Sequence, residues 1–461
     1  MAVVAGSDEG GSLKQPNYIG TVAQSQNTGG ESSSWRRVRI LSDSNWRVLL
    51  MLLVVAMSGD PALATPGVAK IFVPTVAVIL GILVFARKRP KGTFRAGPFV
   101  ALFGAIIVIQ SVHFMMFPMI TILGLLCRIF VAYCLVVLIP DFVGTYIKVI
   151  LGLAILAMSF YFANLAGSAV GIDVAGATKP LALPVSTNAG SWSFLLHSYS
   201  TDENDSTRNA GLFWEPGALA GYVHLGLVFL CVSRSFYTKR GFLVRFLVLS
   251  ACILTTKSTM GYIAFLVVML LAGMSSARHS SRSRFGPILV SLCALALFLY
   301  LALGQDFILP KIQNSIMVST TKTGDWQADR LGSILFDLEY ISARPLTGWG
   351  VSDTTRLALD QDLEGTVLTG RGNGMSDFTA KFGIPALILW IFLLYRMLTH
   401  VSSGHHGMAA LGTLVVLIML NDECFLNYPL FLAFFFFAGP LRNGEPASAP
   451  LHSKGALPCQ Q

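Results

Sequence analysis

The chain has 461 residues, of which 54% are hydrophobic and only 12% are charged, and its formal net charge is +9. Soluble domains usually carry about 25% charged residues, so a soluble protein of this size would lack the charges to cover its surface. The composition therefore excludes soluble enzyme folds, nucleic-acid-binding folds and disulfide-stapled secreted modules. It predicts an all-α polytopic integral membrane protein.

Apolar runs recur along the chain from residue 45 to residue 441. A spanning helix needs about 20 mostly apolar residues, and the runs predict about twelve spans. We place them near 46–64, 69–86, 98–116, 119–139, 143–165, 216–233, 242–256, 259–274, 287–303, 378–397, 408–421 and 425–441. The first run is weak, so residues 46–86 are alternatively a hairpin with one half embedded.

The two ends of the chain predict polar tails, at 1–44 and 442–461. The first is rich in Ser, Gly, Gln and Asn and has no apolar h-region. This composition predicts a disordered tail and no cleavable signal peptide.

Basic residues gather on alternate short connections between the predicted spans. One set carries eighteen Lys and Arg residues, whereas the opposite short connections carry only Lys70 and Lys257. Because basic residues favour the cytoplasmic side, this asymmetry predicts that both termini are cytoplasmic, and it is an ordinary cause of the positive net charge. The two long connections, about 166–214 and about 304–377, are then external, where binding and chemistry usually lie.

The end of the first long connection combines an arginine, two aromatic residues and an acid before a proline. Glu215 followed by Pro216 is favourable helix-start chemistry, so one interpretation is a plain cap. The other places Arg208 and Glu215 at the outer membrane surface as functional groups flanking Phe213 and Trp214. The spacing alone leaves both open.

Residues 324–350 predict an amphipathic helix on or against the membrane, because apolar residues recur at helical spacing from Leu331 to Ile341. Arg330, Asp337 and Arg344 are spaced seven residues apart, which predicts a charged stripe at headgroup depth along the edge of that face. An ordinary solvated edge is the alternative.

Three weaker signals accompany these. Gly348-Trp349-Gly350 predicts a tight turn at the bilayer edge, and the small residues at 258–262 indicate close helix packing or a functional helix start. Arg128 lies in the middle of the 119–139 run, where a charge is costly and usually functional, unless it reaches the interface by a shift of the span. His113 and His224 are expected to be packing residues.

One pattern raises the question of a metal. Asp360-Gln-Asp362 is a D-x-D sequence, but the loop is too short to hold the sizeable α/β domain in which such motifs bind ions. We therefore interpret both acids as solvated loop charges and expect no metal or other cofactor.

Together these elements resemble the Wzy-type bacterial polysaccharide polymerases of the O-antigen polymerase and ligase superfamily. The matching elements are Arg208-x-x-Gly211-x-Phe213-x-Glu215-Pro216, S-T-x-G-Y at 258–262, Asp329-Arg330, Arg344-Pro-Leu-Thr-Gly-Trp-Gly350 and Asn373. The ligase branch usually has a His-Asn pair where this chain has Gly372-Asn373, and no histidine lies between His279 and His400. This departure favours the polymerase branch.

The resemblance implies a GT-C-like protein of the bacterial inner membrane that polymerises undecaprenyl-pyrophosphate-linked repeat units at the periplasmic face. Its partners would be these lipid-linked glycans, membrane lipid, a chain-length regulator and a flippase, and no nucleic acid. Alternatives are ligase-type transfer of finished glycan to lipid A core, and a lipid-linked-sugar flippase or transporter.

The site residues follow from the matching motifs together with the charges above. The expected catalytic residues are Glu215, Arg208 and Arg330, and the expected substrate-binding residues are Arg344, Asn373, Trp214 and Arg128. An arginine fork pairs with phosphate oxygens through two hydrogen bonds, so Arg208 and Arg330 are expected to hold the leaving pyrophosphate. Glu215 would activate the acceptor hydroxyl or orient an arginine. Arg356, in a more acidic part of the loop, is expected to be dispensable.

Overall fold

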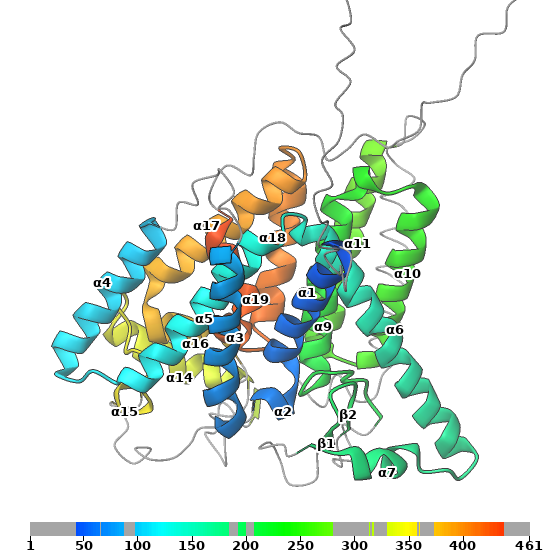
Figure 1. Ribbon diagram of the computed structural model, residues 1–461. Helices are drawn as coiled ribbons and strands as arrows, with labels where there is room; N and C mark the ends of the chain where they lie inside the picture. The colour runs from blue at the N-terminus through cyan, green and yellow to red at the C-terminus, as the bar shows by residue number, and fades with distance from the viewer. Residues whose placement is uncertain are drawn as a thin grey trace, which may run out of the picture. The chain divides into compact units, whose positions relative to one another are not determined.

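The computed structural model of the chain describes residues 43–64, 66–86, 97–183, 192–199, 207–279, 313, 316, 317, 330–356, 359 and 373–437. This described part is helical apart from one pair of short antiparallel strands, β1 (Trp192–Ser193) and β2 (Ser198–Tyr199), and an isolated bridge between Leu183 and Ser193. The helical fold class expected from the composition is therefore confirmed for the described residues (Figure 1).

The helices follow the predicted apolar runs closely. Up to the first long connection they are α1 (Asp43–Gly59), α2 (Pro61–Ala64), α3 (Pro66–Ala86), α4 (Gly97–Phe114), α5 (Met119–Leu138), α6 (Phe142–Ala169), α7 (Val174–Thr178) and the 3-10 helix η1 (Lys179–Leu181). After it come α9 (Pro216–Val232), η2 (Arg234–Phe236), α10 (Lys239–Thr256), α11 (Thr259–His279), α14 (Arg330–Ala343) and α15 (Asp353–Arg356). The last are α16 (Gly374–Phe382), α17 (Ile384–Val401), α18 (His406–Leu420), η4 (Phe425–Asn427), α19 (Pro429–Leu432) and η5 (Ala433–Phe436).

Five helices of the described part are long and apolar enough to cross a membrane. Their spanning segments are Gly67–Ala86, Met119–Leu138, Phe142–Ala169, Thr259–Arg278 and Ile384–Val401, and shorter apolar helices accompany them. The structure is thus that of a polytopic helical protein, while the number of twelve spans stays a prediction. The predicted span 287–303 lies outside the described residues.

Helix α9 lies at the centre of the described bundle, and every one of its residues is buried. It packs against α6, α10, α11 and α18 (Figure 1). Gly221 and Gly226 allow this close packing, since a β-carbon at either position would collide with Phe425 or with Ile150. The residue before α9 is Glu215, so the burial of this helix fixes the position of that carboxylate.

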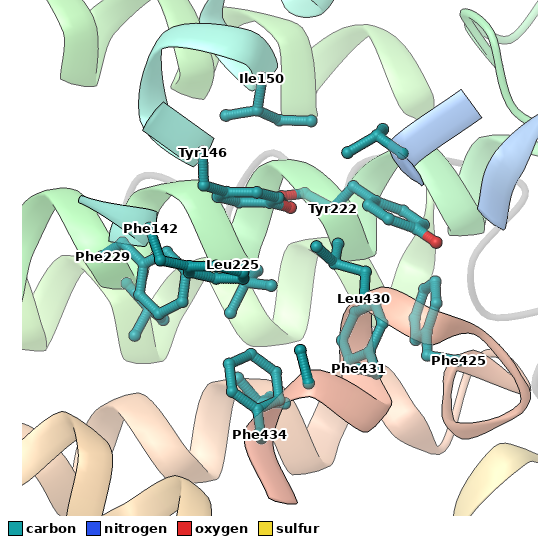
Figure 2. Close-up of a cluster of buried hydrophobic side chains, with 14 of the residues drawn as sticks. Phe142, Tyr146, Ile150, Tyr222, Leu225, Phe229, Phe425, Leu430, Phe431 and Phe434 are labelled. Atoms are coloured by element: carbon teal, nitrogen blue, oxygen red, sulfur yellow. The ribbon is translucent and has the colours of Figure 1, made fainter. Parts of the chain in front are cut away.

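Aromatic side chains from distant parts of the sequence fill the space between α6, α9 and the last helices (Figure 2). The rings of Phe425 and Phe431 stack at 4.7 Å, and Tyr222 meets both edge-on at 5.5 Å. The Tyr146 hydroxyl donates a 2.8 Å hydrogen bond to the Tyr222 carbonyl. This core fixes the C-terminal residues against the central helix.

Two predicted spans are wrong in outline. The run 378–397 is split between α16 and α17, because Gly383 has a φ of +84° and Pro385 opens the next helix. The run 425–441, over its described residues 425–437, is a succession of η4, α19 and η5 that is almost entirely buried. Its hydrophobicity serves the aromatic core of Figure 2, which explains why it resembled a lipid-facing helix in the sequence.

Candidate active site

The end of the first long connection is held against the end of α10. Asn209 is fully buried, and its Nδ2 donates to Thr255 Oγ1 at 2.9 Å while its Oδ1 accepts from the Gly211 backbone at 3.0 Å. Gly211 has a φ of +56°, a conformation that favours glycine. These contacts place Arg208 so that its Nε donates to the Thr256 carbonyl at 3.3 Å.

Glu215 occupies the N-cap position of α9, but its carboxylate does not cap that helix. It lies instead 3.6 Å from Nη2 of Arg330, at the start of α14. Glu215 thus precedes the helix as the sequence predicted, but its carboxylate pairs with Arg330 and makes no capping hydrogen bond. The structure brings together two of the three predicted catalytic residues.

Arg330 makes two further ion pairs, with residues that the sequence analysis did not single out. Its Nε lies 2.7 Å from Asp422 Oδ1, and its Nη2 lies 3.5 Å from Glu423 Oε1. We call Arg330, Glu215, Asp422 and Glu423 the Arg330 cluster. Its members come from three separate parts of the chain, so only the folded structure assembles it.

Asp422 and Glu423 belong to a short turn, Asn421–Cys424, onto which several helices converge. A β-carbon at Gly217 in α9 would lie 2.8 Å from Asp422 Oδ2, and Ser258, just before α11, donates to the same oxygen at 3.2 Å. The backbone of Glu423 lies against Gly374 at the start of α16. Because helix N-termini carry partial positive charge, these helix starts stabilise the two carboxylates.

The carboxylates of the Arg330 cluster differ in their access to solvent. The side chain of Glu215 is 36% exposed and that of Arg330 is 35% exposed, whereas Asp422 is 1% and Glu423 is 8% exposed. A substrate can therefore reach Glu215 and Arg330, while the other two acids hold Arg330 in place from behind.

Arg208 is linked to this cluster through the residues between α10 and α11. It donates to the Thr256 carbonyl, the Ser258 backbone donates to Thr256 Oγ1 at 3.3 Å, and Ser258 donates to Asp422. Lys257 Nζ lies 3.5 Å from Thr207 Oγ1, so a second cation accompanies Arg208. The motif at 258–262 thus joins the predicted site as a structural link.

Two of the predicted binding residues, Trp214 and Arg128, lie near the same turn. Trp214 Nε1 donates to Glu423 Oε2 at 3.1 Å, and its ring lies 5.3 Å from that of Tyr428. Arg128 Nη1 donates to the Asn427 carbonyl at 3.4 Å, and Tyr428 lies within electrostatic range of both Arg128 and Glu215. Arg128 is therefore tied to the protein near the cluster.

Asn373 is fully buried, which gives it a positioning role and no surface for a substrate. Its Oδ1 accepts from the Ser376 backbone and caps α16, while its Nδ2 donates to Asn421 Oδ1 at 3.0 Å. It thereby fastens the start of α16 to the turn that carries Asp422 and Glu423.

The predicted charged stripe on α14 is wrong. Asp337 is fully buried and ion-pairs with Arg356, which is itself only 3% exposed, and Ser376 donates to the other Asp337 oxygen at 2.6 Å. Arg356 Nε also lies 3.8 Å from Asp377, which pairs with Lys381 at 2.5 Å. We call Asp337, Arg356, Asp377 and Lys381 the Arg356 cluster.

The burial of Arg356 argues against the expectation that this residue is dispensable. The buried side of α14 carries Ser333, Phe336, Asp337 and Tyr340, whereas Leu335 and Leu338 are exposed. The mixed polar and aromatic residues on that side are the signal that the sequence offered. The apolar periodicity identified the helix but not its protein-facing side.

Arg344 shares no contact with the Arg330 cluster among the described residues. Its guanidinium lies over the rings of Phe114 and Trp349, and partial burial there lowers its pKa from the ordinary value. The turn lies at residues 345–347, just before the predicted Gly348-Trp349-Gly350 segment. In that segment the backbone N–H groups of Trp349 and Gly350 donate to carbonyls at the end of α16, both glycines have positive φ, and Trp349 is buried.

Within the described ranges no group of three or more His, Cys, Asp or Glu residues is placed to hold an ion, and Asp360 and Asp362 lie outside those ranges. His224 is buried and its Nδ1 lies 2.7 Å from the Ala220 carbonyl, as expected of a packing residue.

The helices and their spanning segments define a multi-pass membrane protein with a charged site at the convergence of several helix ends. Comparison with known families finds a match of residues 244–391 to the Wzy_C family, described as O-antigen ligase. This segment of the chain is therefore similar to the O-antigen ligase and polymerase superfamily, which confirms the resemblance seen in the sequence. The match includes Arg330, Arg344, Arg356 and Asn373, whereas Glu215, Asp422 and Glu423 lie outside it.

No curated protein and no solved structure matches the chain. The arrangement of the Arg330 cluster is therefore argued from its own contacts.

Proposed function

We propose that this protein is a glycosyltransferase that joins undecaprenyl-pyrophosphate-linked oligosaccharide units into a surface polysaccharide at the periplasmic face of the inner membrane. The observation that carries the proposal is the Arg330 cluster, in which an accessible carboxylate and an accessible arginine are fixed side by side. Members of the matched family transfer glycans from lipid carriers, which accounts for a charged site within a multi-pass protein.

In the proposed reaction, the acceptor hydroxyl gives its proton to Glu215 as its oxygen forms a bond to the anomeric carbon of the donor. The bond between that carbon and the pyrophosphate breaks, and the pyrophosphate leaves with the electron pair. A positioned general base contributes about 10²–10⁴ in rate. Glu215 suits this role because it is the most exposed carboxylate of the cluster.

The contacts of Arg330 favour a different role from the one expected from the sequence. Three carboxylates already surround it, and like charges repel a pyrophosphate brought beside them. Arg330 therefore orients Glu215, and the leaving pyrophosphate pairs with Arg208 and the neighbouring Lys257. A preorganised donor of this kind is worth about 10²–10³ in rate.

Exchange of Arg208 tests this assignment. Arg208→Ala should abolish polymer while the protein remains at normal levels in the membrane, and Arg208→Lys should restore little, because a point charge cannot reproduce a two-pronged contact. Arg396→Ala, an exposed arginine of α17, is the matched control. Near-normal polymer from Arg208→Lys would remove the support for a pyrophosphate role.

Polymerase and ligase remain two candidates within the superfamily. The matched family is described as O-antigen ligase, which favours the ligase, whereas the absence of a histidine between His279 and His400 favours the polymerase. The glycan profile of a deletion strain separates them. Loss of a polymerase leaves single repeat units on the acceptor, whereas loss of a ligase leaves finished polymer on the lipid carrier.

A further inference from the structure

The surroundings of the Arg344 side chain are aromatic, unlike those of Arg330 and Arg356 in the same long connection. Its guanidinium carbon lies 4.5 Å from the ring centroid of Phe114 in α4 and 4.6 Å from that of Trp349. The two centroids are 5.9 Å apart, so the cation rests in the notch between two rings. Both distances are within the range of a cation–π interaction, which holds the guanidinium without neutralising it.

Arg344 also lacks the anionic partners that the other two arginines have. Among the described residues no carboxylate lies within ion-pair distance of Arg344, whereas Arg330 has three such partners and Arg356 has two. Its one side-chain hydrogen bond there runs from Nη2 to Nε2 of His113, at the end of α4. A guanidinium has five N–H donors, so most of the N–H groups of Arg344 remain available to a ligand.

The notch is held by hydrogen bonds that do not involve Arg344. Gln110 Nε2 in α4 donates to the Thr347 carbonyl at 2.6 Å and to the Lys381 carbonyl at 2.8 Å. Trp349 Nε1 donates to the Tyr340 carbonyl at 2.8 Å. The rings therefore keep their places with or without a ligand, as expected of a preformed site.

The residues around the Arg344 side chain are strongly apolar and exposed. Met115, in the connection from α4 to α5, is 90% exposed, and Ile120, in the first turn of α5, is 79% exposed. Leu346, two residues after Arg344, is 68% exposed. In a multi-pass protein such residues face lipid. A charged group at this position meets ligands that carry a lipid chain. The available N–H groups of the guanidinium match the oxygens of a phosphate.

We infer that Arg344 and His113 form a binding site for a lipid-borne phosphate, separate from the Arg330 cluster. Arg344 supplies the hydrogen-bonding fork. His113, whose Nε2 lies against Nη2 of Arg344, adds a further donor through Nδ1 when that nitrogen carries the ring proton. The phosphate belongs either to a polyprenyl pyrophosphate or to an anionic phospholipid headgroup, and only the first of these sources rests on the proposed function.

Binding to the purified full-length protein in neutral detergent tests the site. The probes are undecaprenyl pyrophosphate, phosphatidylglycerol and the uncharged undecaprenol, with the number of bound lipids and Kd measured by native mass spectrometry. Arg344→Gln should weaken binding of a phosphate lipid about tenfold or more, because it removes a charge-assisted fork. Undecaprenol binding should not change.

Two further variants keep the result interpretable. His113→Gln should weaken the same probe by a smaller factor, and Arg396→Gln, which removes an equal charge from α17, should have no effect. Arg344→Lys keeps the charge and much of the stem, so it serves if Arg344→Gln does not fold. Thermal unfolding of each variant establishes that the comparison is between folded proteins.

The outcomes separate the two sources. A loss confined to undecaprenyl pyrophosphate identifies the substrate carrier, and an equal loss for phosphatidylglycerol identifies a headgroup site. Unchanged binding of both phosphate lipids in folded Arg344→Gln and Arg344→Lys would overturn the inference. Because binding is measured without turnover, this result is independent of the glycan profile that tests the proposed function.

Discussion

Helix α14 belongs to two ion-pair clusters that differ in their access to solvent. At its first residue, Arg330 is about one-third exposed and faces carboxylates from two other parts of the chain. About two turns further on, Asp337 is fully buried and pairs with a buried arginine. The open Arg330 cluster can meet a substrate, and the closed Arg356 cluster cannot.

The difference indicates which arginines hold the protein together and which take part in chemistry. A buried pair that loses one partner leaves an uncompensated charge, which costs about 3–5 kcal/mol. Exposed pairs contribute only about 0–1 kcal/mol. The Arg356 cluster therefore fastens α14 and α15 to α16, and this fastening determines where α14 presents Arg330.

The largest effect is expected from Arg356→Ala, in contrast to the tolerance expected from the sequence. The change strands Asp337 without its cation, so the protein should unfold at a much lower temperature in detergent and accumulate poorly in the membrane. Adding Asp337→Asn should recover part of this loss, because it removes the stranded charge. Normal levels and normal unfolding of Arg356→Ala would show that the closed cluster is not structural.

Arg330→Ala should have the next largest effect, on both activity and stability. It leaves the buried Asp422 carboxylate without its 2.7 Å partner, so some stability should be lost along with all polymer. Arg330→Lys should preserve more of the stability than of the activity, since one ammonium group cannot contact three carboxylates at once. Polymer gel profiles and thermal unfolding measured on the same preparations separate the two effects.

Glu215→Gln should lower activity with little change in stability. The side chain is partly exposed and its pair with Arg330 is long, at 3.6 Å, so unfolding should remain within about 1 kcal/mol of the parent. Loss of the base should reduce the rate of polymer formation by about 10²–10⁴. Wild-type rates in Glu215→Gln would move the base to another group of the open cluster.

The smallest effect is expected from Asp360→Asn combined with Asp362→Asn, because we interpret both acids as solvated loop charges. Polymerisation in isolated membranes should continue at a near-normal rate in this variant, and also in the parent after treatment with a strong chelator. A collapse of product under either condition would mean that the D-x-D sequence holds a required ion.

Several parts of the site were predictable from residue patterns. The order Arg208, Glu215, Arg330 and Asn373 indicated the superfamily, and Glu215 before Pro216 indicated the start of a helix. The pair Asp422-Glu423 was not singled out, although two adjacent acids between two apolar runs are a visible signal. Its meaning depends on the starts of α9, α11 and α16 meeting at one turn, which no local pattern reveals.

The sequence by itself determined that the protein is helical and apolar enough for the membrane, and where most of its helices begin and end. Hydrophobic periodicity, glycine and proline are local signals, and they act within a few residues. Only the tertiary structure decided which arginine is buried and which is open, because burial depends on contacts between distant segments. Thus Arg356, which the sequence predicted to be dispensable, lies at the centre of a closed ion cluster, and Arg330 has two partners from the far end of the chain.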